Sequence, residues 1–198
     1  AKEQRDAARA GGKTAILRNQ YDGVRLMVDA ARKFIGESEI AGLWPDADSE
    51  TVIQWREGDV WLRCRLDRFT YDHRYVIDYK STENASPGVF PRQIPALGYH
   101  IQDAFYRRGV RALGGDDPAF IFLAQSVNFP FRCGLYGCDP QLRVIAEAQV
   151  EAAIERWREC LRTKEWPGYG PRVHWVDAPV WLQREHEEMQ ALSGAGAR

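Results

Sequence analysis

Two aspartates and a lysine are the residues of this sequence best suited to chemistry. Asp67 ends one predicted strand, and ten residues separate it from Asp78, which stands two residues before Lys80 on the next strand. Because side chains alternate along a strand, Asp78 and Lys80 project from one face, which Asp67 can reach from a neighbouring strand. Two carboxylates that close repel each other unless a cation lies between them, and Mg²⁺ prefers oxygen ligands. The spacing therefore predicts a site for Mg²⁺, or for Mn²⁺ in its place.

A cation held by Asp67 and Asp78 would polarise a phosphoryl oxygen and lower the pKa of a bound water. Lys80 would orient that water or stabilise the charge of the transition state. The alternative is structural, because an Asp and a Lys two residues apart on a strand often form a solvated pair. The spacing alone leaves both interpretations open.

Hydrophobic patterns predict the elements that must position these residues. Helical periodicity covers residues 15–35, about 94–112 and 140–164, and residues 81–95, with three prolines, are predicted as a loop. Strand patterns cover residues 51–56, 60–67, 74–80, 119–125 and 131–138. Grouped strands followed by a crossover helix favour an α/β (α+β) fold, in which helices flank a central mixed β-sheet.

Length and composition predict one globular domain over residues 1–198. A chain of 198 residues, 44% of them hydrophobic, can bury one sizeable core. The small-residue end predicts a frayed tail over about 183–198. Because the sequence opens without a methionine, we expect it to be the C-terminal part of a longer polypeptide.

Charge and hydropathy narrow the classes of partner. With 27 basic and 28 acidic side chains the net charge is −1, so any contact with a polyanion needs a local patch. No apolar run reaches the ~18 residues of a membrane span, and no signal peptide is visible, so the sequence predicts a cytoplasmic protein without a membrane partner. The four scattered cysteines predict neither a disulfide scaffold nor a zinc or iron-sulfur site.

Several motifs, in order, resemble the PD-(D/E)XK nuclease superfamily, and most closely phage and prophage exonucleases of the RecE (exonuclease VIII) type. The motifs are RLDR, IDYKST, YHIQDAFYRRGVRAL, FIFLAQ and WPGY, and the resemblance runs from about Ala7 to Trp181. It implies a restriction-endonuclease-like core, which agrees with the predicted mixed sheet. It also implies roles for individual residues: metal ligands Asp67 and Asp78, a further ligand in the Tyr79 carbonyl, a third acidic ligand in Glu50, and a catalytic lysine, Lys80.

Gln102 and Tyr106 match the Gln-x-x-x-Tyr motif of the RecB-like branch of this superfamily. Four residues apart on a helix, they share one face, and the resemblance implies that both act in catalysis and touch DNA. Arg68, Arg107 and Arg108 are candidates for phosphate contacts, and surface solvation is the alternative for each. Two features depart from the relatives: their upstream histidine motif has no counterpart here and is expected before Ala1, and Ser126 stands where they often have Glu.

The resemblance implies a Mg²⁺-dependent 5′-to-3′ exonuclease that degrades double-stranded DNA from its ends in phage or prophage recombination. It further implies a homo-oligomeric ring, a single-strand annealing recombinase as partner, and the cytoplasm of a bacterium or phage-infected host. Two alternatives stay open. One is a RecB-like nuclease of different polarity, and the other is a catalytically silent DNA-binding or assembly module with the same fold.

Overall fold

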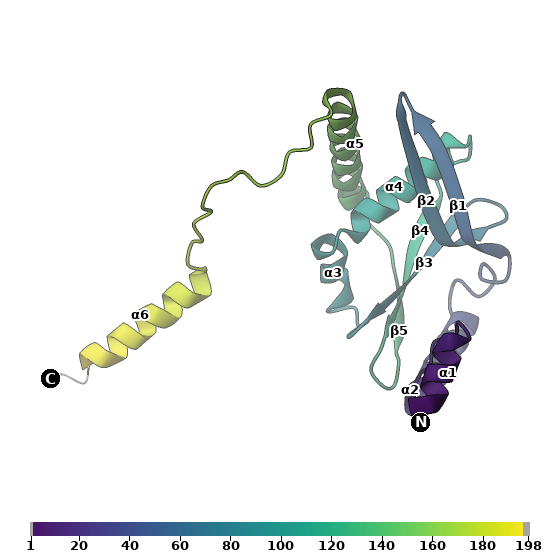
Figure 1. Ribbon diagram of the computed structural model, residues 1–198, viewed down its shortest axis with the longest axis horizontal. Coiled ribbons are helices and arrows are strands. Elements are labelled where there is room, and N and C mark those ends of the chain that lie inside the picture. Colours follow the sequence, from purple (N-terminus) through teal and green to yellow (C-terminus); the bar gives the residue numbers. More distant parts are fainter. Residues whose placement is uncertain (1, 196–198) are drawn as a thin grey trace. The chain divides into compact units, whose positions relative to one another are not determined.

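The structure, a computed structural model, describes residues 2–195 and divides into two compact units, residues 1–163 and 164–198. The elements of the first unit are coloured in chain order in Figure 1. They are α1 (Lys2–Ala10), α2 (Arg18–Glu37), β1 (Ala47–Glu57), β2 (Val60–Thr70), β3 (Tyr75–Thr82), α3 (Phe90–Ala96), α4 (Tyr99–Ala112), β4 (Ala119–Ser126), β5 (Cys133–Tyr136) and α5 (Pro140–Thr163).

The first unit is built on a five-stranded sheet in the order β1-β2-β3-β4-β5. β1 with β2, β2 with β3, and β4 with β5 are antiparallel pairs, whereas β3 and β4 run parallel. A parallel pair needs a long crossover, and α3 and α4 supply it between β3 and β4. The predicted mixed sheet with flanking helices is therefore confirmed.

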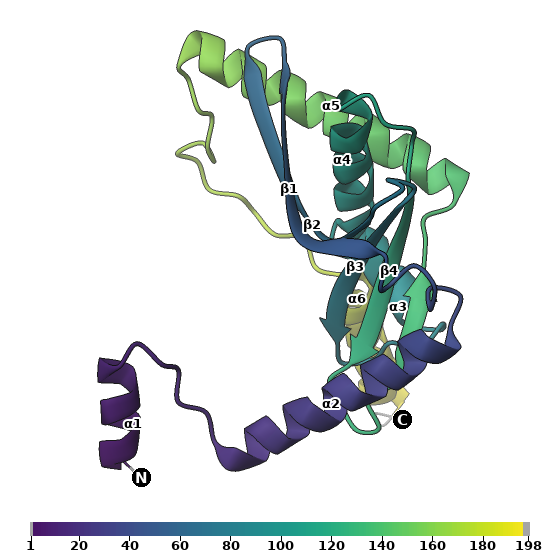
Figure 2. The ribbon, with the colours of Figure 1, turned by 90° about the vertical axis from the view of Figure 1, so that its right-hand side faces the viewer.

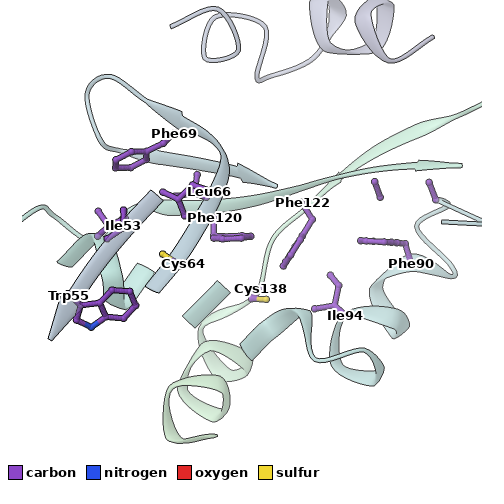
Figure 3. Close-up of a cluster of buried hydrophobic side chains, with 14 residues drawn as sticks. Ile53, Trp55, Cys64, Leu66, Phe69, Phe90, Ile94, Phe120, Phe122 and Cys138 are labelled. Atoms are coloured by element: carbon purple, nitrogen blue, oxygen red, sulfur yellow. The ribbon is translucent and has the colours of Figure 1, made fainter. Parts of the chain in front are cut away.

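Alternation along the central strands divides the core between the two faces of the sheet. Val76 and Phe122 pack with Phe90 of α3 in the main cluster, part of which Figure 3 shows. Ile77, the next residue along β3, packs instead with Ile35 of α2. The crossover helices thus cover one face and the C-terminal end of α2 covers the other (Figure 2).

The β1–β2 hairpin is distorted where it reaches the predicted active site, and it bends sharply in Figure 2. β1 and β2 pair on either side of Glu50 and Asp67 but not at these two residues. Glu50 has a φ of 59°, in the left-handed region that non-glycine residues rarely adopt. Leu66 and Phe69 belong to the same core cluster although they are three positions apart, an odd spacing that would place them on opposite faces of a regular strand, so the alternation of faces breaks between them. Asp67 lies at that break.

The observed boundaries correct several predicted ones. The predicted helix over about 94–112 is two helices, because Gly98 adopts a φ of 74° between α3 and α4. Most of α3 lies inside the segment that was predicted as a loop because of its prolines. Proline is accepted in the first turn of a helix, and α3 has one there. Asp67 lies within β2 and not at its end, because the strand continues to Thr70. The polar helix α1 gave no apolar pattern and was not predicted.

The second unit contains α6 (Val180–Ala195) after a segment without regular structure. Residues 183–195, which were predicted as part of a frayed tail, lie in this helix, and their run QREHEEMQAL consists largely of good helix formers; residues 196–198 of the predicted tail lie outside the described residues. Among the described helices, none combines the length and the hydropathy that crossing a membrane requires.

Candidate active site

Asp67 and Asp78 meet where β2 and β3 separate. The two strands pair as far as Arg68 and Ile77, and the same register would place Asp67 opposite Asp78. The pairing stops there, and the Asp67 carboxylate accepts a hydrogen bond from the backbone N–H of Tyr79, with 2.9 Å between N and Oδ2. A side chain of β2 thus replaces a backbone ladder bond and fixes Asp67 against the strand that carries Asp78.

Asp78 is the most buried charged group of the site, with a side chain only 2% exposed. Its Oδ1 accepts a hydrogen bond from Gln102 Nε2 at 2.6 Å, and Lys80 Nζ lies 2.5 Å from its Oδ2. Burial raises the pKa of Asp78, and the negative charge of Asp67 adds to this, whereas Lys80 and Gln102 oppose it. The buried carboxylate is thus short of compensating positive charge even beside a lysine.

Lys80 is held on both sides of its ammonium group. Besides the contact with Asp78, Nζ lies 4.8 Å from the centre of the Tyr99 ring at the start of α4. An aromatic face attracts a cation, and the side chain is only 17% exposed. The prediction that Asp78 and Lys80 share a face is confirmed, and the Lys80 ammonium group is fixed beside the Asp78 carboxylate.

α4 brings Gln102 into the site and packs Tyr106 beneath it. Tyr106, one turn after Gln102, meets the Phe120 ring edge-on with 6.0 Å between centroids. Burial raises the pKa of the Tyr106 hydroxyl, and the neighbouring Gln102 acts against that rise. The pair therefore lies along one side of the helix, as the spacing predicts. A contact between Tyr106 and DNA stays a prediction.

The carboxylate oxygens of Asp67 and Asp78 are suitable ligands for a divalent cation. The two carboxylates stand on neighbouring strands, and the buried Asp78 Oδ2 contacts Lys80 Nζ at 2.5 Å. Oxygen ligands of this kind suit Mg²⁺. Asp67 and Asp78 would hold the ion, and the Tyr79 carbonyl stays a predicted third ligand.

Glu50 does not join this group, which corrects the prediction of a third acidic ligand. Its exposed carboxylate pairs with Arg65, with 2.9 Å between Arg65 Nε and Glu50 Oε2. Over residues 2–195 the structure forms no group of three or more His, Cys, Asp or Glu side chains placed to hold a metal ion. The left-handed backbone at Glu50 interrupts the pairing of β1 with β2 and redirects the Glu50 side chain, which the sequence pattern does not reveal.

Two of the predicted phosphate contacts are wrong. Arg107 is 2% exposed and is surrounded by three acidic partners: Asp103 at 2.6 Å, Asp117, and Glu147 at 3.3 Å. Arg108 donates to Glu57 and, at 2.6 Å, to Glu151. Both guanidinium groups tie α4 to neighbouring elements. Arg107 is closed off from solvent, and Arg108, whose side chain is 25% exposed, is already bound by two carboxylates.

Arg68 remains at the site. Its guanidinium lies over the Trp44 ring at 5.0 Å, and it donates hydrogen bonds to the Ser49 hydroxyl and the Trp44 carbonyl. It lines the same cavity as Asp67. Of the three predicted arginines, Arg68 therefore keeps a position from which it can meet a phosphate.

Gln125 is a residue whose role the sequence did not indicate. It is 1% exposed and accepts a hydrogen bond from the Tyr79 hydroxyl at 2.6 Å. Its amide nitrogen donates to the carbonyls of Met27 in α2, at 2.8 Å, and of Phe131, at 3.2 Å. The sequence feature that points to Gln125 is its position as the polar residue that ends the apolar run FIFLAQ.

Ser126 stands where the relatives often have Glu. Its hydroxyl donates a hydrogen bond to the Glu83 carbonyl at 2.9 Å.

A mixed sheet whose second and third strands part at two aspartates, with a lysine two residues after the second, defines a PD-(D/E)XK-type domain. Residues 4–179 match the family described as "PDDEXK-like domain of unknown function (DUF3799)", and the chain belongs to that family. The predicted membership of the PD-(D/E)XK superfamily is thereby confirmed.

One solved structure with this fold comes from Eubacterium rectale and is described as a "Putative exonuclease". It superposes with a TM-score of 0.63 at 12% sequence identity, over 90% of this chain and 71% of its own. At that identity the likeness shows the fold. Among curated proteins, none matches the chain.

Proposed function

We propose that this chain is a Mg²⁺-dependent deoxyribonuclease that degrades double-stranded DNA from its 5′ ends. The observation that carries the proposal is the cluster of Asp67, Asp78 and Lys80, with Gln102 bound to the buried Asp78 carboxylate at 2.6 Å. The family and the fold support a nuclease, and the description of the structural neighbour as an exonuclease supports cleavage from an end.

The residues divide the chemistry between them. PD-(D/E)XK nucleases generally use divalent metal ions; Asp67 and Asp78 would hold such an ion, which would supply a Lewis acid and lower the pKa of a bound water. The Tyr79 N–H and Gln102 each hold one of the two carboxylates in place, Asp67 and Asp78 respectively. Lys80, fixed between Asp78 and Tyr99, donates to the phosphate or to the attacking water, where it offsets the charge that builds up.

The assembly belongs to the proposal too. A net charge of −1 gives no general attraction for DNA, so a processive enzyme of this kind needs another way to keep hold of its substrate. A homo-oligomeric ring that encloses the duplex would do so, and size-exclusion chromatography with light scattering tests it. We place the protein in the cytoplasm of a bacterium or phage-infected host, with a single-strand annealing recombinase as partner, which co-purification would test.

The decisive experiment compares linear with covalently closed circular duplex DNA in the presence of Mg²⁺, with the linear substrate labelled at one end. We expect early release of a 5′ label from the linear DNA and an intact circle. Early release of a 3′ label would assign a RecB-like nuclease of the opposite polarity. Nicking of the circle would show an endonuclease, and binding without cleavage would show a silent module.

A further inference from the structure

The β1–β2 hairpin has an exposed outer face that begins beside the candidate active site. Beyond the bend, β1 and β2 continue as a two-stranded hairpin (Figure 2). Along β2, Cys64 and Leu66 are buried in the core, so Arg63 and Arg65 project from the opposite face of the strand. Asp67 of the candidate metal site follows Arg65 at the same two-residue step. The two arginines therefore lead from the metal site toward the hairpin turn.

β1 adds a third arginine to this surface. Arg56 pairs in register with Trp61, and its guanidinium lies 5.8 Å from the centre of the exposed Trp61 ring. Gln54 stands opposite Arg63 and is exposed as well. The helices α4 and α5 pack on the other side of the hairpin, where Leu62 meets side chains of both. We call the outer surface formed by Arg56, Trp61, Arg63 and Arg65 the hairpin face.

The hairpin face keeps a net positive charge. Two acids near the turn, Glu57 and Asp59, pair with arginines of α4 and α5. Glu50 of β1 meets the hairpin face and pairs with Arg65 at 2.9 Å, and both side chains are more than half exposed. An exposed ion pair of this kind contributes little to stability, so the Arg65 guanidinium can exchange the carboxylate for another anion. Three arginines thus stand against one weakly held carboxylate.

The spacing of these arginines matches a DNA backbone. Side chains on one face of a strand are about 7 Å apart, and each DNA strand presents one phosphate for about every 3.4 Å of helix axis. Neighbouring arginines of β2 can therefore meet every second phosphate of one strand. From Asp67 to Trp61 the protein strand spans about 20 Å, which corresponds to about six base pairs.

We propose that the hairpin face holds the phosphate backbone of the intact duplex next to the cleavage site, over about two to six base pairs. The inference rests on the proposed function and names the surface that keeps the chain on its substrate between cleavage steps. Arginine suits this role because its planar guanidinium binds phosphate through two hydrogen bonds, and phosphate contacts do not read the base sequence. A chain with a net charge of −1 must gather such contacts locally.

The test measures affinity for a short duplex over a range of salt concentrations, with the far end of the duplex closed by a loop. The Asp78→Asn protein is the background, so that the DNA stays intact. The triple variant combines Arg56→Gln, Arg63→Gln and Arg65→Gln, and the control is Arg156→Gln, at an exposed position of α5. We expect the slope of log Kd against log salt concentration to decrease by about 1 for each hairpin arginine replaced and to stay unchanged in the control.

Methylphosphonate linkages, which carry no charge, locate the contact on the DNA. Placed about two to six base pairs from the open end, they should weaken binding by the Asp78→Asn background protein. They should cause no further loss in the triple variant, because both changes remove the same contacts. The effect of the triple variant should also be equal for two duplexes of different base sequence.

Circular dichroism checks that each variant is folded, and the single variants Arg63→Gln and Arg65→Gln repeat the salt measurement with smaller changes. A salt slope that stays the same in the folded variants and the control would overturn the proposal. An equal loss from methylphosphonates in the background protein and the triple variant would overturn it too.

The two levels of inference fail differently. A wild-type chain that digests linear DNA, while the triple variant keeps the salt slope of its background, refutes the hairpin face alone. A wild-type chain that never digests DNA refutes the proposed function, and the binding measurements still decide whether the hairpin face contacts phosphates.

Discussion

Replacing Gln102 by leucine would show how far the active-site carboxylate depends on its neighbour in α4. The substitution keeps the approximate size of the side chain and removes the donor that lies 2.6 Å from Asp78 Oδ1. Because Asp78 is almost wholly buried, water cannot readily replace that donor. The carboxylate would lose both a stabilising contact and the group that fixes its orientation.

The size of the effect follows from the charge of the acceptor. A hydrogen bond to a charged group contributes about 1.5–3 kcal/mol, which corresponds to about 10- to 150-fold in kcat/KM if the bond is kept through the reaction. Gln102→Glu should lose more, because it adds a third negative charge next to Asp67 and Asp78. The concentration of Mg²⁺ for half-maximal activity should rise in Gln102→Leu.

The assay is the initial rate of nucleotide release from linear duplex DNA over a Mg²⁺ titration. Gln141→Leu is the matched control, since Gln141 is exposed on α5, and it should keep the wild-type rate. Thermal unfolding shows whether each variant is folded. A folded Gln102→Leu protein with the wild-type kcat/KM and Mg²⁺ dependence would refute the view that this contact holds Asp78 for catalysis.

Three further predictions concern the contacts around the site. Arg107→Met should lower the free energy of unfolding by about 3–5 kcal/mol, because buried Asp103 loses its nearest cation and keeps only the more distant Arg143, at 3.9 Å; a smaller loss in urea titration would contradict this. Arg108 lowers the pKa of Glu57, so the stability from this pair is fully present above the ordinary pKa of 4.5 and is lost as the pH falls through the lowered pKa. The advantage of wild type over Glu57→Gln in urea unfolding should therefore shrink from pH 7 to pH 3, and a constant advantage would count against it. Gln125→Leu should reduce kcat more than it raises KM, because it frees the Tyr79 ring near Asp67, and a pure KM effect would contradict a positioning role.

Local patterns were enough to predict the sheet and the central cluster. Alternation along the third strand predicts that Asp78 and Lys80 lie on one face, and the structure agrees. Both faces of β3 are packed, so a shift of the strand register by one residue would move Ile77 out of its core cluster. The crossover order of strands and helices also follows from the sequence, since a parallel pair needs a long connection. These features depend on residues close in the chain.

What the sequence did not reveal depends on contacts between distant residues or on a single backbone angle. Glu50 has a left-handed conformation that turns it to Arg65, and no pattern marks a glutamate for that role. Arg107 looks like a surface residue after the Gln-x-x-x-Tyr pair, yet acidic partners from other segments bury it. Gln125 gains its role from α2, nearly one hundred residues earlier.

The most direct test of the account is the release of nucleotides from linear duplex DNA by the wild-type, Asp78→Asn and Lys80→Gln proteins, with Mg²⁺ and with EDTA. The account predicts Mg²⁺-dependent release by the wild type alone, with both variants folded and at least about 100-fold slower, as is typical when a group that stabilises transition-state charge is removed. Release at the wild-type rate by folded Asp78→Asn or Lys80→Gln, or release in EDTA, would contradict it.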